Sequence, residues 1–284
     1  FIPQAPRSVH LTTHNRKSQN TMCTLLIAID QHPDYPWVIA ANRDEYRDRP
    51  TAPMQWWADR PDLLAGRDLR AGGTWMGATR GGRFAALTNF REGRCVYPRG
   101  PSRGFLVSQF LMDTRPPRDG LEAIARQAER CDGFNLVAGD PHGGLYYYGN
   151  RDAAPDSPRR LAAGIYGLSN HRLDTPWPKV VRGKDLLADS LTATGDRLEA
   201  RLFDLLTDTT LPADADLPDT GVGRDWERIL APLFINSPHY GTRCSSVVRL
   251  DQHGRLTLVE RTHPRPGEAD GRPSDRRFRF EIAM

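Results

Sequence analysis

A cysteine directly after a methionine, Met22-Cys23, is the first place in this sequence where residue type and position suggest chemistry. If translation starts at Met22, the small Cys23 side chain should allow removal of the methionine, which leaves Cys23 as residue one. An α-amine has an unperturbed pKa of about 7.7–8.0, so it could accept the proton of the Cys23 thiol. A terminal amine that acts as base for its own residue's nucleophile is an established mode of catalysis. The dipeptide alone also fits a buried strand cysteine after an ordinary start methionine.

The polar run Asn42-Arg43-Asp44-Glu45 is the second candidate, because it directly follows an apolar segment. This order places polar groups at the end of a predicted strand, where antiparallel neighbours can present them together. Asp44 could hold the amine of Cys23, and Arg43 could pair with Asp44 or with a substrate carboxylate. Asn42 and Arg43 are therefore candidate substrate-binding residues. An ordinary charged turn would have the same composition.

The charge pattern argues against a nucleic-acid-binding protein. The chain has 39 basic and 35 acidic residues, a formal charge of +4 and a pI near 9.0. Acidic residues are interleaved with the arginines, as in residues 42–50 and 272–281, and this pattern predicts a mixed-charge surface. No apolar run approaches the roughly 20 residues that span a bilayer.

The cysteines predict neither a zinc site nor a disulfide framework. Cys23, Cys95, Cys131 and Cys244 lie far apart and form no C-x-x-C pair. The histidines likewise form no helix-spaced pair for a metal, so we expect no metal site. This use of cysteine favours a reducing compartment, and we expect the protein to be cytoplasmic.

The order of the predicted elements indicates the fold class. Residues 1–21 are polar and aperiodic and predict a disordered or non-native upstream tail, whereas residues 22–284 predict a single domain. Strand patterns come first, then two helices near 105–112 and 119–131, then more strands, a helical block over 178–206, an acidic loop over 207–225, and final strands. This segregation predicts an α+β fold with mostly antiparallel sheets. Glycine-bearing hairpin turns are expected at 80–82, 141–144 and 251–254.

Several motifs in order give a more specific expectation. "MCTLLIA", "ANRDE", "GGTWMG", "ALTNFRE", "GLSNHRLDTPWPKV" and "YGTRCSSVV" resemble the NRDE-motif family, that of transport and Golgi organization protein 2. The resemblance runs from Met22 to about Leu250. It implies a four-layer αββα sandwich like that of the N-terminal-nucleophile hydrolases, which include bile salt hydrolases and penicillin V acylases.

The same resemblance implies roles for individual residues. Cys23 is similar to the nucleophile of those hydrolases and Asp44 to the aspartate that positions its amine. Asn89 and Asn170 resemble active-site asparagines, Asn170 the one in the oxyanion hole, and Arg243 resembles a late active-site arginine. One feature departs from the pattern, because those hydrolases have an arginine three residues before the aspartate and this chain has Ala41.

Two functions remain open at this level. The first is an enzyme in which Cys23 attacks an amide or thioester of a small acyl substrate, with no cofactor required. The second is a non-catalytic haem carrier or chaperone, with haem as cargo, because relatives of the family are implicated in moving haem. Trp75 and His171 are further candidates for substrate binding in either case, although a strand tryptophan is usually core and a lone turn histidine usually has no such role.

Overall fold

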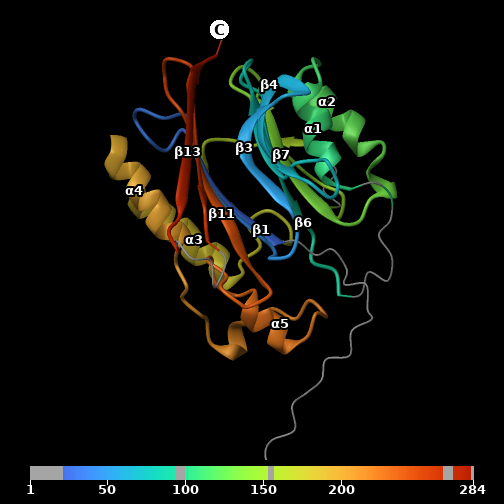
Figure 1. Ribbon diagram of the computed structural model, residues 1–284, viewed down its shortest axis with the longest axis vertical. Helices are drawn as coiled ribbons and strands as arrows, with labels where there is room; N and C mark the ends of the chain where they lie inside the picture. The colour runs from blue at the N-terminus through green and yellow to red at the C-terminus, as the bar shows by residue number, and fades with distance from the viewer. Residues whose placement is uncertain (1–21, 94–99, 101, 153–156, 265–270, 283–284) are drawn as a thin grey trace, which may run out of the picture.

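The described part of the chain is built from two antiparallel sheets stacked face to face (Figure 1). The structure is a computed structural model that describes residues 22–93, 100, 102–152, 157–264 and 271–282. The tail expected over residues 1–21, and Cys95, lie outside these residues. Among the helices of the described ranges, none is long and apolar enough to cross a bilayer.

The first sheet has six strands in the order β10-β1-β2-β11-β12-β13. Their bounds are Gly164–Leu168 (β10), Met22–Ile29 (β1), Trp37–Tyr46 (β2), Tyr240–Leu250 (β11), Arg255–Thr262 (β12) and Ser274–Glu281 (β13). Segments from both ends of the chain therefore lie side by side at the centre of this sheet, with β2 between β1 and β11.

The second sheet has seven strands that follow the order of the sequence, from β3 to β9. Their bounds are Thr51–Trp57 (β3), Arg60–Asp68 (β4), Met76–Thr79 (β5), Phe84–Asn89 (β6), Phe134–Asp140 (β7), Gly144–Gly149 (β8) and Arg159–Arg160 (β9). Hairpins at the predicted turns join β5 to β6, β7 to β8 and, in the first sheet, β11 to β12. Gly82 has φ +83° in the first of these turns, a backbone conformation that glycine adopts without strain.

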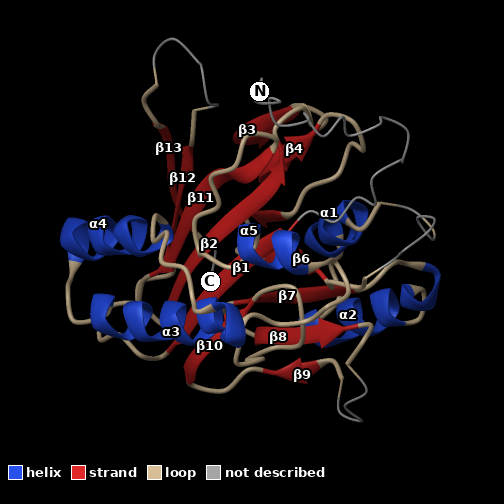
Figure 2. Cartoon of the chain, turned by 90° about the horizontal axis from the view of Figure 1, so that it is seen from below, coloured by secondary structure: helices blue, strands red, loops and turns tan. Residues whose placement is uncertain are grey.

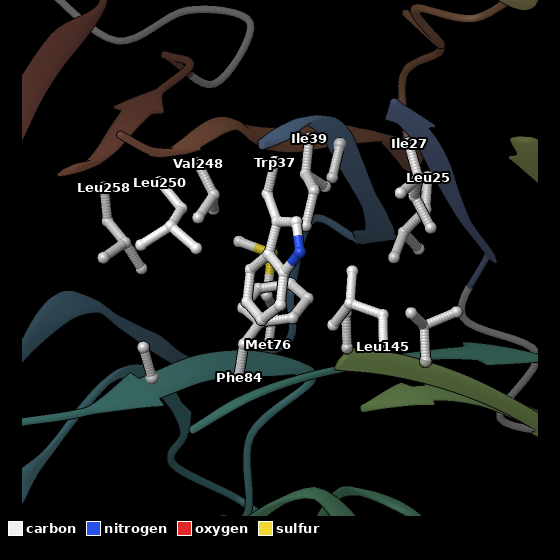
Figure 3. Close-up of a cluster of buried hydrophobic side chains, with 14 of the residues drawn as sticks. Leu25, Ile27, Trp37, Ile39, Met76, Phe84, Leu145, Val248, Leu250 and Leu258 are labelled. Atoms are coloured by element: carbon white, nitrogen blue, oxygen red, sulfur yellow. The ribbon is translucent and has the colours of Figure 1, made fainter. Parts of the chain in front are cut away.

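The core between the sheets comes from one face of each strand. Side chains alternate between the two faces of a strand, and every residue of β1 is buried, so both faces of β1 are covered. Leu25, Ile27 and Ile39 point from the first sheet toward Phe84 and Leu145 of the second (Figure 3). The apolar contact between the sheets therefore fixes which face of β1 and β2 looks inward.

Helices cover the outer face of each sheet. The pair α3 (Pro178–Ser190) and α4 (Gly195–Leu206) packs on the first sheet, and α1 (Gly104–Met112) and α2 (Pro117–Ala125) pack on the second (Figures 1 and 2). The layers are therefore helix, sheet, sheet, helix. The predicted four-layer αββα sandwich with mostly antiparallel sheets is confirmed.

Some elements differ from the sequence-based prediction. The patterns do not predict β3 and β4, and β3 is an edge strand that contains Pro53 and shifts register twice against β4. The helical block over 178–206 is two helices, since the chain turns at Gly195 with φ +56°. The helix expected over 119–131 runs over Pro117–Ala125 and is followed by a short 3-10 turn. A short helix, α5 (Arg224–Ile229), follows the acidic loop.

Candidate active site around Cys23

The Asn42-Arg43-Asp44-Glu45 run lies within β2, and the strand divides it between two faces. Cys23 lies opposite Arg43 in the register of β1 with β2, and Met22 lies opposite Asp44. Arg43 and Glu45 face the second sheet, as Cys23 does, and line a cavity with it. Asn42 and Asp44 point to the other face, toward the helices. The motif therefore serves two different environments.

The cavity lies between the sheets, at the end where β1 begins. Its volume is about 370 Å³. Its lining includes Cys23, Trp75, Asn89 and Cys244, and its charged lining residues are Arg43, Arg49, Arg67, Arg70, Arg103, Arg243, Glu45, Asp68, Asp132 and Glu260. This lining suits a small polar or charged molecule better than a hydrocarbon chain.

The Cys23 thiol is held in its protonated form. Burial raises its pKa far above the ordinary value, and the nearby Asp44 raises it further. The guanidinium of Arg43 and a hydrogen bond from the Asp44 backbone N–H oppose this rise but do not cancel it. A preformed thiolate is therefore absent at neutral pH. Cys23 can act as a nucleophile only if a neighbouring group takes its proton during the attack.

A β-bulge in β11 brings two residues to the cavity instead of one. Thr242 pairs with Asp44 and Cys244 pairs with Arg43, so Arg243 is the extra residue between them. Both Arg243 and Cys244 line the cavity as a result. Arg243 donates from Nη1 to the carbonyl oxygens of Arg47 and Arg49, at 3.0 and 3.3 Å. These bonds hold its guanidinium beside the turn that follows β2.

Arg43 belongs to a chain of charged groups along the cavity wall. Its Nη2 lies 3.3 Å from Glu45 Oε2, and Arg49 Nε forms an ion pair with the same oxygen at 3.5 Å. Arg49 in turn pairs with Asp68 on β4 at 2.7 Å. Each acid is shared or paired with an arginine, which fixes the direction of these guanidinium groups. The chain of ion pairs joins the two sheets at the cavity wall, from β2 to β4.

Asp44 occupies a buried charged cluster on the helix side of β2. Its Oδ1 accepts from Thr242 Oγ1 at 2.6 Å. Its Oδ2 is buried and has no hydrogen-bond partner among the residues that the structure describes. Burial raises the pKa of Asp44, and Lys179 on α3 is the strongest influence that lowers it. A buried carboxylate oxygen without a donor is costly, so the site is built for a further donor.

The two predicted asparagines lie next to each other near Cys23. Asn89 ends β6 and lines the cavity. Asn170 follows β10, is fully buried, and donates from Nδ2 to the Asn89 carbonyl at 3.0 Å. The Ser169 hydroxyl lies 3.1 Å from Asn170 Oδ1 and 3.5 Å from the Cys23 carbonyl oxygen, so it can donate to either oxygen. Asn170 is not among the residues that line the cavity, so the structure places it behind Asn89.

Asn42 has a different place from the one that its predicted role requires. Its Nδ2 donates to the carbonyl oxygens of Leu206 and Leu233, at 2.8 and 2.9 Å, and its Oδ1 accepts from Ser245 at 2.7 Å. The side chain is buried away from the cavity, and these bonds use both of its N–H groups. We therefore correct the assignment to substrate binding: Asn42 fastens the C-terminal end of α4 to the first sheet.

The network of Asn42 continues to a histidine that should control acid stability. Because the Ser245 hydroxyl donates to Asn42, His263 Nε2, at 2.8 Å, must donate to Ser245 Oγ. Burial and Arg261 lower the pKa of His263 to about 4. Between the ordinary value of about 6.5 and about 4, the unfolded chain binds a proton that the folded chain does not. The contribution of neutral His263 to the free energy of unfolding is therefore fully present above pH ~6.5 and is lost as the pH falls toward ~4.

We expect His263→Gln to flatten this acid limb. The wild-type free energy of unfolding should fall by about 1–2 kcal/mol more than that of the variant between pH ~6.5 and ~4, after allowance for solvent screening. Urea unfolding of both proteins at several pH values measures the difference. Titration of the carboxyl groups common to both proteins contributes equally to each and cancels in this difference. Parallel curves over this range would contradict the role assigned to His263.

Trp75 and His171 differ in their relation to the cavity. Trp75 is partly buried, packs against the core between the sheets and also lines the cavity. His171 has Nδ1 2.8 Å from Thr175 Oγ1, and its ring lies against Phe90 and Trp177. It is absent from the cavity lining, so the structure gives it no contact with a molecule bound there.

The sequence reasoning missed four residues of the site. Lys179, Tyr240 and Thr242 surround Asp44 and Met22, and Cys244 is a second thiol in the cavity. All four lie within the family motifs "DTPWPKV" and "YGTRCSSVV", and membership of these motifs is the one sequence signal that points to them. A lysine within a helix and a tyrosine at a strand start carry no chemical signature by themselves, so only the fold assigns them to the site.

Fold and site together define a class of protein: an αββα sandwich in which a cysteine at the start of a central strand faces an arginine-rich cavity. The chain belongs to the family described as Transport and Golgi organisation 2, whose model matches residues 22–265. The resemblance to the NRDE-motif family is therefore confirmed.

Curated relatives support this membership over most of their length. The Transport and Golgi organization protein 2 homolog of Bos taurus is 34% identical over 263 residues, which cover 85% of this chain and 93% of that protein. The Homo sapiens homolog is 32% identical over the same shares. Transport and Golgi organization protein 2 of Drosophila melanogaster is 26% identical, and the match covers 92% of its length.

Solved structures are similar only at a low level. A mutant conjugated bile acid hydrolase from Clostridium perfringens matches 92% of this chain and 97% of its own, with 9% identity and a TM-score of 0.40. A Caenorhabditis elegans ortholog of N-acylethanolamine-hydrolyzing acid amidase matches 79% and 92%, with 12% identity and a TM-score of 0.34. At these scores neither structure assigns an activity to this chain.

Proposed function

We propose that the protein is a cysteine hydrolase of the N-terminal-nucleophile kind, in which Cys23 attacks an amide or thioester of a small acyl substrate. One observation carries the proposal. The Asp44 oxygen that lacks a donor among the described residues belongs to the residue opposite Met22, beside the place that the Cys23 amine would take once Met22 is removed. The thiol of that same residue faces a cavity.

The amine would supply the base that the buried thiol needs. The sulfur of Cys23 attacks the acyl carbon, and the neutral α-amine takes the thiol proton. The bond from the acyl carbon to the leaving nitrogen or sulfur breaks, and the leaving group receives that proton. Water then attacks the acyl-cysteine thioester and releases the acid, which restores thiol and amine. Asp44 would orient the amine through a charge-assisted hydrogen bond.

Asn89 is the candidate donor for the oxyanion that forms on the acyl oxygen. It lines the cavity next to Cys23, and the bond from Asn170 Nδ2 to its carbonyl oxygen holds its backbone in place. A preorganised donor of this kind contributes roughly 2.7–4 kcal/mol to lowering a barrier. Arg43 and Arg243, which also line the cavity, would bind an anionic part of the substrate.

The lining of the cavity favours this function over carriage of haem. Haem is a broad apolar ring and needs an apolar slot. Here ten charged side chains line the cavity, and salt bridges join Arg43, Glu45, Arg49 and Asp68 across it. The two thiols, Cys23 and Cys244, are the iron-binding side chains that a haem carrier would use at this site.

The first test asks whether Cys23 is an N-terminal nucleophile. A chain expressed from Met22 should have the intact mass of a protein that begins at Cys23. 2-Cyanobenzothiazole condenses with a free amine and thiol on the same residue, so it should label this protein once, at Cys23. Incubation with a panel of acyl amides and acyl thioesters should then leave an acyl-enzyme mass adduct on Cys23.

Cys244 provides the matched control, because its thiol lines the same cavity but its amine is in a peptide bond. Cys244→Ala should be labelled as the parent protein is, and Cys23→Ala should not be labelled. Retention of Met22 on the active protein, or acyl adducts that persist in Cys23→Ala, would overturn the proposed mechanism.

A further inference from the structure

The cluster behind Cys23 contains a buried lysine that the proposed mechanism does not yet use. Lys179, on α3, is 4% exposed, and its Nζ donates to the Leu230 carbonyl oxygen at 3.0 Å. Leu230 belongs to the same buried apolar cluster as Met22 and Tyr240. The Met22 backbone N–H donates to Tyr240 Oη at 2.7 Å. Lys179 is thus bound to a residue of the apolar cluster that contains Met22.

The charges of this cluster balance in pairs. Arg91, which follows β6, pairs with Glu227 on α5 at 2.6 Å, and both side chains are buried. Asp44 on β2 and Lys179 are the other acid and base of the cluster. Each is the strongest opposite charge that acts on the pKa of the other. Tyr240 on β11 stays neutral, because burial raises its pKa well above the ordinary value. The pocket is therefore close to neutral before the Cys23 amine enters it.

This balance matters because the amine must be uncharged to accept a proton. Beside Asp44 alone, the amine would sit next to an unbalanced buried carboxylate and would be stabilised as an ammonium ion. An ammonium ion cannot take the proton of the thiol. Burial lowers the pKa of Lys179 to about 8, so Lys179 is largely protonated at neutral pH, and its positive charge near Asp44 reduces this bias.

We propose that Lys179 is a positioning residue that balances Asp44 and so keeps the α-amine of Cys23 in its uncharged, proton-accepting form. The inference rests on the proposed N-terminal nucleophile and assigns the helix-side cluster a part in its activation. Lys179 itself touches neither the substrate nor the thiol in this scheme. Asp44 orients the amine, and Lys179 sets its charge.

The test measures thiol reactivity and needs no identified substrate. Iodoacetamide alkylates Cys23 when sulfur displaces iodide and the amine takes the thiol proton, so the rate follows the fraction of uncharged amine. The rate is measured by peptide mapping across about pH 5–10 in chains that begin at Cys23. Lys179→Met should move the inflection upward by about 1 pH unit or more, with about a tenfold lower rate below it.

Two controls separate charge from structure. Lys179→Arg keeps the charge and should keep the inflection within a few tenths of a pH unit of the wild type. Lys184→Met removes the other lysine of α3, which pairs with Asp174 at the surface, and should change nothing. If Lys179→Met does not fold, Lys179→Gln, which keeps a donor for Leu230, removes the same charge.

The outcomes are distinct. An unchanged inflection in the charge-removing variant overturns the role of Lys179 and leaves the nucleophile standing. Failure of the wild type to condense with 2-cyanobenzothiazole instead removes the proposed function itself, and with it the basis of this inference.

Discussion

Cys23→Ser should lower hydrolysis of an acyl substrate by about 10³-fold or more in a chain that begins at residue 23. A serine hydroxyl is far less acidic than a thiol, and the site already disfavours the anion, since burial and Asp44 both raise the pKa of the Cys23 thiol. The α-amine would have to remove a much more tightly held proton. Steady-state kcat/KM of the parent and the variant measures the loss.

Cys244→Ser tests whether the loss belongs to the activated cysteine or to any thiol of the cavity. Cys244 pairs with Arg43 as Cys23 does and is also buried, but no free amine accompanies it. Its replacement should change kcat/KM by less than about tenfold. Equal losses in both variants would contradict the nucleophile assignment. Haem binding by both variants, without turnover in the parent protein, would favour the carrier instead.

The sequence predicts the location of the site better than the roles within it. An apolar strand followed by Asn42-Arg43-Asp44-Glu45 places polar groups at a strand end, and the alternation of strand side chains puts Arg43 and Asp44 on opposite faces. Which of these faces looks into a cavity depends on the second sheet and on α3. The second sheet and α3 pack on the first sheet from distant parts of the chain, so no local pattern contains that information.

The misplaced residues show the same limit. Asn42 fits a substrate site by type, yet it donates to the carbonyl groups of Leu206, at the end of α4, and of Leu233, which follows α5. The bulge at Arg243 appears in the pairing between β11 and β2, and none of Thr242, Arg243 and Cys244 is a glycine or a typical turn residue. Edge strand β3 contains Pro53 and has no clean alternation, so its strand signal is weak.

The largest loss of stability is expected from Glu227→Ala. Glu227 Oε2 accepts from Arg91 Nη1 at 2.6 Å, and its Oε1 accepts from the backbone N–H and hydroxyl of Thr220. The Arg91 side chain is almost completely buried, and its Nε and Nη2 have no hydrogen-bond partner within the described ranges. Truncation of Glu227 would leave a buried cation unpaired, which typically costs roughly 3–5 kcal/mol. Urea unfolding measures the change in free energy.

Asp225 on the same helix gives the matched control, because its side chain is 93% exposed and pairs with Arg228 at 3.1 Å. Asp225→Ala should cost less than about 1 kcal/mol, as is usual for surface ion pairs.

A double variant, Arg91→Met with Glu227→Leu, removes both charges and should recover much of the stability that the single change loses. It would also remove the Arg91–Glu227 pair from the helix-side cluster and leave Asp44 and Lys179 in place. If that double variant stays folded and Cys23 alkylation keeps its pH inflection, the balance between Asp44 and Lys179 is sufficient to set the charge of the amine. A large shift would assign the Arg91–Glu227 pair an equal share.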